Sequence, residues 1–565
     1  MKKLLLPFLA VFFGLFLLYP LTYLLGGAFF VDSPEGGTRF TLEYFRIIFE
    51  NPFYRECFFN SLLIACWTTF FCLAIALPLA LLFLRCRFPG KTLFSTAILL
   101  PLILPPFVGA IGLKQCFARF GSLNLILAEF GLVDLRNPPD WFGQGGFAGI
   151  ILLEVLHLYP IMFLSVQAAL ANLDPSLRDA AQNLGATSGR IFRTITLPLA
   201  LPGIFAGSSI VFVSAFTDLG VPLMFDFQTT IPTQIFNLVT QADNPLGYAL
   251  VVLTLVLVAA FFLLGKKLGE GNYAMLARSA TYDDAVRLPA WAGLAAAAAV
   301  GLLLTISILP HLGVILQSFA ARWFFTVLPG EWSTAYYAEV FSNDLTSISI
   351  QNSLLYATLS ALFDLGLGFG IAYLLARESF RGKDLLDVVA MLPLALPGLV
   401  LAFAYFTAFS RPPFDSLGWI DPRQNPTLIL VIAYAVNRLP YIVRAAYAGF
   451  QQTHVSLEEA SANLGAGPLR TLWKISLPLL SANLIAGTIL TFSFAMLDVS
   501  SGMILAQESA FYPVTKAIYM LMGRITPTAP SVACALGVLA MLLLAASLAL
   551  ASKLLGQKMG QLFKA

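Results

Sequence analysis

Four acidic residues lie inside long apolar stretches of the sequence, where a charge is costly and often has a function. They are Glu154, Asp218, Asp364 and Asp498. Asp218 and Asp498 each follow a Leu-Pro pair at the same spacing, and one interpretation places both on a central path, facing a substrate or its external gate. The alternative makes them caps of re-entrant turns, or partners of Arg438, of Lys114 or of each other's helices.

Other residues that could support catalysis or metal binding are sparse. Glu154 and His157 are three residues apart, and a structural pair is favoured over a proton relay. The three histidines are scattered and the six cysteines form no CxxC pair, so neither a metal site, a cofactor nor a disulfide is expected. The sequence has no G-x-x-x-x-G-K-[ST] pattern, so this chain is not expected to hydrolyse ATP.

A polar, glycine-containing segment occurs twice in the chain. Residues 179–203 read DAAQNLGATSGRIFRTITLPLALPG, and residues 459–483 read EASANLGAGPLRTLWKISLPLLSAN. Ten of these 25 positions carry the same residue, in register. Two copies at equivalent sites favour a docking surface for a partner with two-fold symmetry over a hairpin that merely packs on its own bundle.

Capping signals predict two short helices in each copy. In the first copy Asp174-Pro175 begins a helix and Gly185 ends it, and a second helix ends by Pro198. In the second copy Ser456 and Glu459 have the spacing of a capping box, and Gly465 ends that helix. Pro468 is then expected to open the next helix and Pro478 to close it.

The composition requires a membrane around most of the chain. Of its 565 residues 58% are hydrophobic and only 11% are charged, whereas soluble domains have about 25% charged residues. Apolar segments of bilayer-spanning length are predicted near 4–29, 60–84, 95–117, 147–170, 203–223, 247–265, 290–318, 353–376, 386–409, 427–450, 484–505 and 531–551. The fold class is therefore an all-α integral membrane protein with about 12 transmembrane helices.

The lysines and arginines predict the orientation of these helices. With the N-terminus in the cytoplasm, most basic loops fall on the cytoplasmic side, together with both copies of the repeated segment and the C-terminus. The longer loops, including Trp141, then lie outside.

The two halves of the chain repeat beyond this segment. NSLLIACWTT at 60 corresponds to NSLLYATLSA at 352, and LPLILPPFVGA at 100 corresponds to LPLALPGLVLA at 392. Each half has an even number of helices, so the repeats are parallel. We expect one six-helix half at 1–280, with its core at about 57–265, and a second at 281–565, with its core at about 348–551.

The repeated segments resemble the EAA loop of type I ABC importer permeases, in which E-A-A is followed by three residues, a glycine and then I-x-L-P. The first copy departs from this pattern with Asp179 for the glutamate, and the second with Ser461 for an alanine. The resemblance covers nearly the whole chain and implies two fused permease domains of that fold. It implies that the ATPase-docking residues of the two coupling helices are Asp179, Ala180, Ala181, Leu184, Gly185, Ala186, Glu459, Ala460, Ser461, Leu464, Gly465 and Ala466.

The resemblance also implies the partners. These are two ATP-binding-cassette ATPase subunits in the cytoplasm and an external substrate-binding protein, at the inner membrane of a bacterial cell; no nucleic acid is expected. A fused permease most resembles the ferric iron, thiamine and phosphonate branch, so ferric iron or a small anionic or organic nutrient is the expected substrate. The main alternative is an ion-gradient-driven secondary transporter, which explains the helix count but not the two matched loops.

Overall fold

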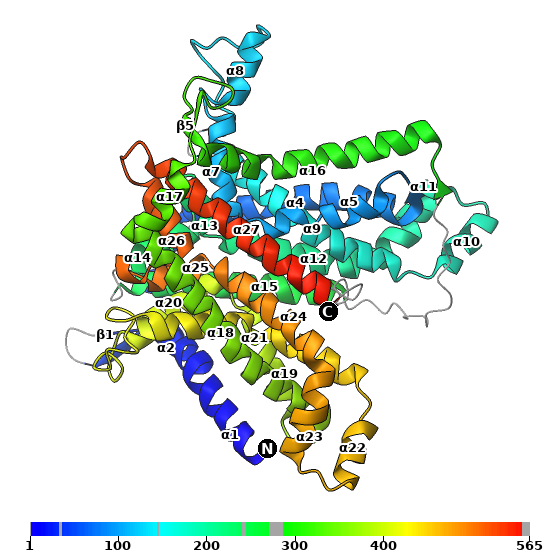
Figure 1. Cartoon of the computed structure of the whole chain (residues 1–565), viewed down its shortest axis with the longest axis vertical. Coiled ribbons are helices and arrows are strands. Elements are labelled where there is room, and N and C mark those ends of the chain that lie inside the picture. Colours follow the sequence, from blue (N-terminus) through cyan, green and yellow to red (C-terminus); the bar gives the residue numbers. More distant parts are fainter. Residues whose placement is uncertain (1, 33–36, 144–145, 240–243, 270–285, 556–565) are drawn as a thin grey trace. The chain divides into compact units, whose positions relative to one another are not determined.

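The computed structural model describes residues 2–32, 37–143, 146–239, 244–269 and 286–555, which fold almost entirely into helices (Figure 1). The chain divides into two compact units. Unit 1 comprises Met1–Arg55, Ile231–Leu255 and Ser333–Ala565, and unit 2 comprises Glu56–Thr230 and Val256–Trp332.

Unit 2 is built mainly from the first half of the sequence. Its helices are α4 (Pro52–Arg85), α5 (Lys91–Ala97), α6 (Leu100–Ile103), α7 (Pro106–Phe117), α8 (Ser122–Glu129), α9 (Phe147–Ala171), α10 (Pro175–Asn183), α11 (Ser188–Ile191), the π-helix η3 (Phe192–Thr196), α12 (Leu197–Thr217), α13 (Gly220–Met224) and α16 (Ala290–Ser318). Strands β3 (Cys86–Arg87) and β4 (Val286–Arg287) pair in parallel, and β5 (Ala320–Arg322) and β6 (Glu331–Trp332) pair antiparallel.

Unit 1 is built mainly from the second half. Its helices are α1 (Lys2–Phe13), the π-helix η1 (Gly14–Leu18), α2 (Tyr19–Phe29), α3 (Glu43–Glu50), α14 (Ile231–Val239), α17 (Ala335–Ser342), α18 (Asp344–Arg377), α19 (Lys383–Met391), η4 (Leu392–Ala395), α20 (Gly398–Phe409), α21 (Thr427–Gln452), α22 (Ser456–Asn463), α23 (Pro468–Thr471), the π-helix η5 (Leu472–Ser476), α24 (Leu477–Met496), α25 (Ser500–Leu505), η6 (Ser509–Phe511), α26 (Val514–Met522) and α27 (Ala529–Leu555). Strands β1 (Phe30–Asp32) and β2 (Thr38–Phe40) form an antiparallel hairpin, and α15 (Pro245–Gly269) begins in unit 1 and ends in unit 2.

The predicted number of spans agrees with the structure once two broken helices are allowed for. Ten helices in the described ranges are long and apolar enough to cross a membrane, and two bent helix pairs raise the number to 12. The bent pairs are Lys91–Leu102 with Pro106–Glu129, at 94°, and Lys383–Ala395 with Gly398–Phe409, at 101°. They replace the straight spans expected at 95–117 and 386–409, because a proline precedes each second segment and disfavours helical backbone in the residue before it.

The first helix of each sequence half packs in the unit built mainly from the other half. In unit 1 the hydroxyl of Tyr405, on α20, donates a 2.6 Å hydrogen bond to the carbonyl oxygen of Phe16, which lies between α1 and α2. In unit 2 α16 crosses α7 so closely that a Cβ on Gly112 would lie 1.9 Å from the carbonyl oxygen of Pro310. The bounds 1–280 and 281–565 remain a prediction about the sequence repeat, whereas each compact unit contains the first helix of the other sequence half.

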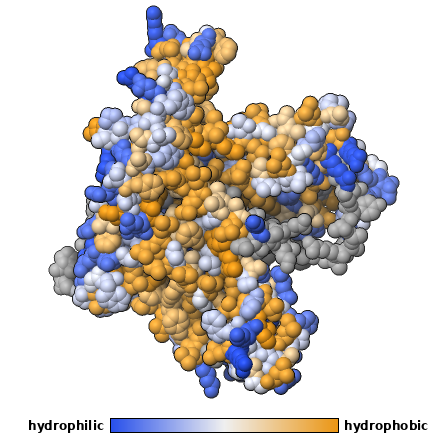
Figure 2. Space-filling view, viewed as in Figure 1, coloured by the Kyte–Doolittle hydropathy of each residue, from blue (hydrophilic) through white to orange (hydrophobic). Residues whose placement is uncertain are grey.

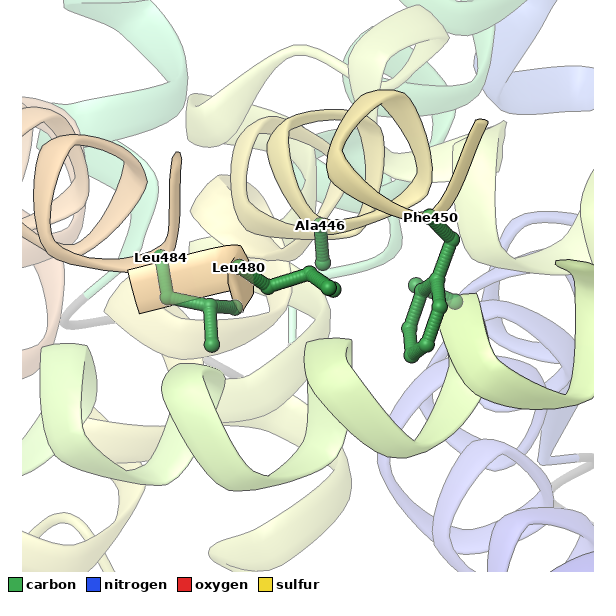
Figure 3. Packing of buried hydrophobic residues seen from close by; sticks show 5 residues of the cluster. Ala446, Phe450, Leu480 and Leu484 are labelled. Atoms are coloured by element: carbon green, nitrogen blue, oxygen red, sulfur yellow. The ribbon is translucent and has the colours of Figure 1, made fainter. Parts of the chain in front are cut away.

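Helices α18, α21 and α24 form the tightest packing of unit 1. Their contact holds a cluster of buried side chains, Ala372, Ala446, Phe450, Leu480 and Leu484 (Figure 3). Ile442, four residues before Ala446 on α21, packs against two glycines of the neighbouring helices. A Cβ on Gly368 would lie 2.4 Å from an Ile442 side-chain atom, and a Cβ on Gly487 would lie 2.7 Å from one. Because lipid is as apolar as these side chains, such close packing, made possible by small residues, is what holds the helices together.

Hydrophobic residues form much of the surface in the view of Figure 2, including that over α18 and α24. Hydrophilic residues gather at the ends of helices, for example around α10. An apolar band of this kind suits contact with lipid, and the polar ends suit contact with water.

Candidate functional site

The first repeated loop is a short helix closed at both ends by local hydrogen bonds. Asp174 caps α10, its Oδ1 accepting from the backbone N–H of Ser176 at 2.9 Å, as the sequence predicts. At the other end the N–H groups of Gly185 and Ala186 donate to the carbonyl oxygens of Gln182 and Ala181. This is a Schellman motif, and it requires the left-handed backbone that Gly185 adopts, with φ of +80°.

The second loop repeats the C-terminal cap but not the predicted N-terminal one. Gly465 has a φ of +82°, and Ala466 N donates to the carbonyl oxygen of Ser461. The predicted capping box is wrong, because α22 starts one residue earlier than the box requires. Val455 is its N-cap, Ser456 is already helical, and the Ser456 hydroxyl contacts His454 Nδ1 at 3.5 Å.

Each loop presents a leucine almost fully exposed at the end of its short helix. The exposed fraction is 88% for Leu184 and 89% for Leu464. Asp179, Ala180, Glu459 and Ala460 are also exposed, Ala181, Ala186 and Ala466 are half-buried, and Gly185 and Gly465 are exposed. Ser461 is buried instead, because its hydroxyl lies 2.8 Å from that of Thr471.

Pro198 and Pro478 do not end the second helix of each loop, so that prediction is wrong. Residues Ser188–Thr217 form one continuous span, and Pro468–Met496 form its counterpart. In both copies a π-helical turn, η3 or η5, directly precedes the Leu-Pro pair. The wider turn accommodates the ring and the missing N–H of the proline, which would otherwise break the helix.

An ion pair that sequence reasoning missed anchors the second loop. Arg377, the last residue of α18, lies 3.1 Å from Glu458 Oε2, and the two side chains are only 9% and 15% exposed. Arg377 Nη2 also donates to the carbonyl oxygen of Thr453 at 2.9 Å, and the Ser476 hydroxyl donates to Glu458 Oε1 at 3.1 Å. The motif draws attention to Glu459, but its neighbour Glu458 attaches the loop to the membrane helices.

The first loop lacks this ion pair. The repeat aligns Glu458 with Arg178 and Arg377 with Arg85, so two cations stand where the second half has a cation and an acid. The two guanidinium groups lie within electrostatic range of each other, and neither makes an ion pair with another described residue. The two loops therefore share their C-terminal cap but differ in how they are attached.

Asp218 and Asp498 both cap a short helix at the end of a membrane span. Asp218 Oδ2 accepts from Val221 N, in α13, at 2.7 Å, and Asp498 Oδ1 accepts from Ser501 N, in α25, at 2.8 Å. Asp498 also pairs with Arg438, whose Nη2 lies 3.0 Å from its Oδ2. This geometry matches the capping and pairing alternative of the sequence analysis.

The predicted pairing of Glu154 with His157 is not formed. His157 Nδ1 lies 2.8 Å from the carbonyl oxygen of Pro101, in α6. The carboxyl group of Glu154, which is 3% exposed, lies close to that of Asp218 instead. Helical spacing correctly placed Glu154 and His157 near each other on α9, but neighbouring elements provided the partner of each side chain.

Helix α25 is bounded by charges that complement its dipole. Asp498 lies at its N-terminus, and the buried ammonium of Lys516, on α26, donates to the carbonyl oxygens of Met503, at 2.8 Å, and Ala506. Burial lowers the pKa of Lys516 from its ordinary value of 10.5 to about 8. No group of three or more potential metal ligands occurs within the described residues.

This arrangement defines a class of protein: a polytopic helical membrane protein with two sequence repeats, each exposing one short helical loop. Residues 63–271 and 366–561 each match the family of the binding-protein-dependent transport system inner membrane component, and the chain belongs to that family. It is thus a fused, two-domain permease of an ABC importer, a multi-pass inner-membrane protein.

Some relatives match most of this chain, and others match little more than a third of it. The ferric transport system permease protein FbpB of Actinobacillus pleuropneumoniae is 29% identical over 518 residues, covering 87% of this chain and 70% of the relative. The putative ferric transport system permease protein FbpB 1 of Haemophilus influenzae is 29% identical and covers 87% and 76%. The molybdenum transport system permease protein ModB of Escherichia coli K12 is 31% identical but covers only 36% of this chain and 88% of its own.

Proposed function

We propose that this chain forms the translocation path of the importer and couples it to ATP hydrolysis by separate ATPase subunits. The docking elements are α10 and α22 with their C-terminal caps. The observation that carries this proposal is the matched pair of leucines, Leu184 and Leu464, each almost fully exposed beside the same left-handed glycine cap. An apolar side chain held out on a well-ordered helix end suits a pocket on a partner protein.

Two docking elements on one chain imply a complex of one permease with two ATPase subunits. Native mass spectrometry of the purified complex measures this ratio directly. One permease chain with two ATPase chains and no second permease is the expected composition, and two permeases with two ATPases would contradict it.

We propose ferric iron, delivered by an external binding protein, as the substrate. The two relatives that cover 87% of this chain are named as ferric transport permeases, whereas the molybdenum permease matches little more than a third of it. Uptake of radiolabelled ferric iron into proteoliposomes, with molybdate, phosphonate and thiamine as competitors, tests this assignment. Absence of iron uptake, together with uptake of one of the other compounds, would reassign the substrate to a small anionic or organic nutrient.

Replacing the exposed leucines tests the coupling. Leu184→Ser and Leu464→Ser remove no buried contact within the permease, so its thermal stability is expected to stay within about 0.5 kcal/mol of the parent. Loss of a docked leucine costs about 2 kcal/mol, or roughly 30-fold in affinity for the ATPase. Affinity of the purified permease for its purified ATPase, together with ATP-dependent uptake, provides the measurement.

Leu328→Ser is the matched control, because Leu328 is 58% exposed but lies outside both loops. It is expected to bind the ATPase as the parent does. Normal ATPase affinity in both loop variants would remove the coupling assignment. Uptake driven by an ion gradient without ATP would favour the secondary transporter.

We further propose that both loops and both termini face the cytoplasm. The distribution of lysine and arginine supports this orientation. Single cysteines placed at Gly467 and at Trp141 should react with a membrane-impermeant reagent from opposite sides. Labelling of position 467 from the outside would contradict the orientation.

A further inference from the structure

One partly buried arginine, whose side chain is 23% exposed, and two buried acids lie on the most tightly packed helices of unit 1. Asp364 lies on α18, Arg438 on α21, and Asp498 between α24 and α25. Asp364 precedes Ala372 by eight residues, and Arg438 precedes Ala446 by eight, about 12 Å along each helix. The cluster of Figure 3 and the glycine contacts of Ile442 therefore hold the helices that carry these charges in register.

Arg438 is only partly satisfied by its hydrogen bonds. Its Nη2 bonds Asp498 Oδ2 at 3.0 Å and contacts the carbonyl oxygen of Phe494 at 3.4 Å. Its Nε is buried and has no hydrogen-bond partner among the described residues. The guanidinium group therefore retains a free donor on a buried edge.

Asp364 is the unpaired member of the group. It is fully buried, and neither of its carboxyl oxygens has a hydrogen-bond partner in the described part of the chain. The charged group in electrostatic range of Asp364 is Arg438. An ionised carboxylate left in this state inside a membrane would be very costly, since its charge would be neither solvated nor paired.

The charges around the site do not balance if both acids are ionised. The phenol of Tyr434 is in electrostatic range of Arg438 and Asp498, and its ring lies edge to face with that of Tyr356, with 6.5 Å between the ring centres. A phenol adds no positive charge. Among the residues that the structure describes, one cation therefore faces two acids, and one acid must bind a proton for the site to be neutral.

The corresponding site of unit 2 also contains two acidic carboxyl groups. The repeat aligns Asp498 with Asp218, Tyr434 with Glu154, Arg438 with Leu158, and Asp364 with Cys72. There the buried carboxyl group of Glu154 lies close to that of Asp218. In the second repeat the second acid, Asp364, is in electrostatic range of the arginine that pairs with the capping Asp498, whereas the first repeat has Leu158 at the position of that arginine.

We propose that Asp364, Arg438 and Asp498 form a proton-binding switch within the membrane, in which the guanidinium pairs with one carboxylate while the other carboxyl group holds a proton. In the structure the pair is Arg438 with Asp498, and the proton is on Asp364. When the guanidinium turns to Asp364, the O–H bond there breaks and one forms on Asp498. The total charge is unchanged, and the long arginine side chain can make this move while the helices stay packed.

Infrared difference spectroscopy of the purified full chain in lipid nanodiscs can count protonated carboxyl groups by their C=O absorption. Asp364→Asn should remove the band of one protonated aspartic acid. Asp498→Asn, which can still cap α25 through its amide oxygen, should also remove one band, because Arg438 then pairs with Asp364 and that group loses its proton. Arg438→Gln should add one band, since both acids then stay protonated.

Asp384→Asn, at an exposed position in the first turn of α19, is the matched control and should leave the spectrum unchanged. The Glu154–Asp218 pair contributes a constant background to every variant. An unchanged band in Asp364→Asn would show that Asp364 is ionised and would overturn the proposal. A band that survives in Asp498→Asn would equally overturn it, since Asp364 would then be a fixed neutral acid. If Asp498→Asn does not purify as a monodisperse protein, Arg438→Gln decides, and absence of the added band contradicts the switch.

Discussion

Arg377 and Glu458 form a nearly buried ion pair at the cytoplasm-facing end proposed for α18, where the guanidinium also lies 5.2 Å from the centre of the Phe450 ring. The corresponding residues of the first repeat, Arg85 and Arg178, carry the same charge. The two repeated loops therefore share their C-terminal cap but are unequally attached to their membrane helices. Their responses to substitution should differ accordingly.

Removing the acid of this pair should loosen the second loop. Glu458→Gln leaves the nearly buried guanidinium of Arg377 without a carboxylate partner. Breaking a buried ion pair in this way costs about 3 kcal/mol of stability. We expect a lower melting temperature of the purified permease and weaker ATPase binding. Glu459→Gln is the matched control, since the adjacent Glu459 is exposed, and it should leave the melting temperature unchanged. Equal melting temperatures for both variants would mean that the ion pair does not hold the loop.

The left-handed glycines give a test that separates backbone strain from steric contact. A Cβ on Gly465 or on Gly467 would meet nothing within 4 Å, but only Gly465 has a positive φ. Gly465→Val should therefore distort the loop at a cost of about 1–3 kcal/mol and weaken ATPase binding roughly 5- to 150-fold. Gly467→Val should bind the ATPase much more nearly as the parent does. Gly185→Val should act as Gly465→Val does, and parental binding and transport in both would show that the caps are not needed for docking.

Packing around Ile442 should be sensitive to a single methyl group. Gly368→Ala would place a Cβ 2.4 Å from Ile442 Cγ2, whereas Gly366, two residues away, has open space around it. Overpacking of this kind costs about 1–3 kcal/mol, so Gly368→Ala should lower the melting temperature. Gly366→Ala should not, and thermal unfolding followed in the same detergent compares the two. Equal stability of the variants would mean that α18 and α21 can separate without loss.

Lys516 should make the stability of unit 1 depend on pH in the alkaline range. Its pKa is about 8 in the folded protein against an ordinary 10.5, so between these values the unfolded chain binds more protons. Stability should then rise with pH from about 8 to 10.5, by about 3 kcal/mol from this group. Lys516→Met should remove this rise and lower stability at the upper end, because the carbonyl oxygens of Met503 and Ala506 lose their donor.

The melting temperature of parent and Lys516→Met, measured across this pH range in one buffer series, checks the prediction. The two curves should differ in slope, with the parent rising relative to the variant. Parallel curves would show that Lys516 titrates at the same pH in the folded and the unfolded chain.

The features that the sequence determined by itself are those set within a few residues of the chain. Apolar length marked the spans, Asp174 and Pro175 marked the start of α10, and the glycines at 185 and 465 marked left-handed backbone. Each follows from local hydrogen bonding or local sterics. The sequence also predicted the repeat itself, because the repeated residues keep their order in the two halves.

The tertiary structure alone decided which side chains meet. Glu154 pairs with Asp218 and not with His157, Asp498 pairs with Arg438, and Glu458 pairs with Arg377, all across 60 to 81 residues of chain. The π-turns that carry the helices through Pro198 and Pro478 were likewise not predicted, since the proline by itself signals an end. These side-chain pairs and π-turns depend on which helices pack together and how deeply the residues are buried. The local pattern of residues does not determine either.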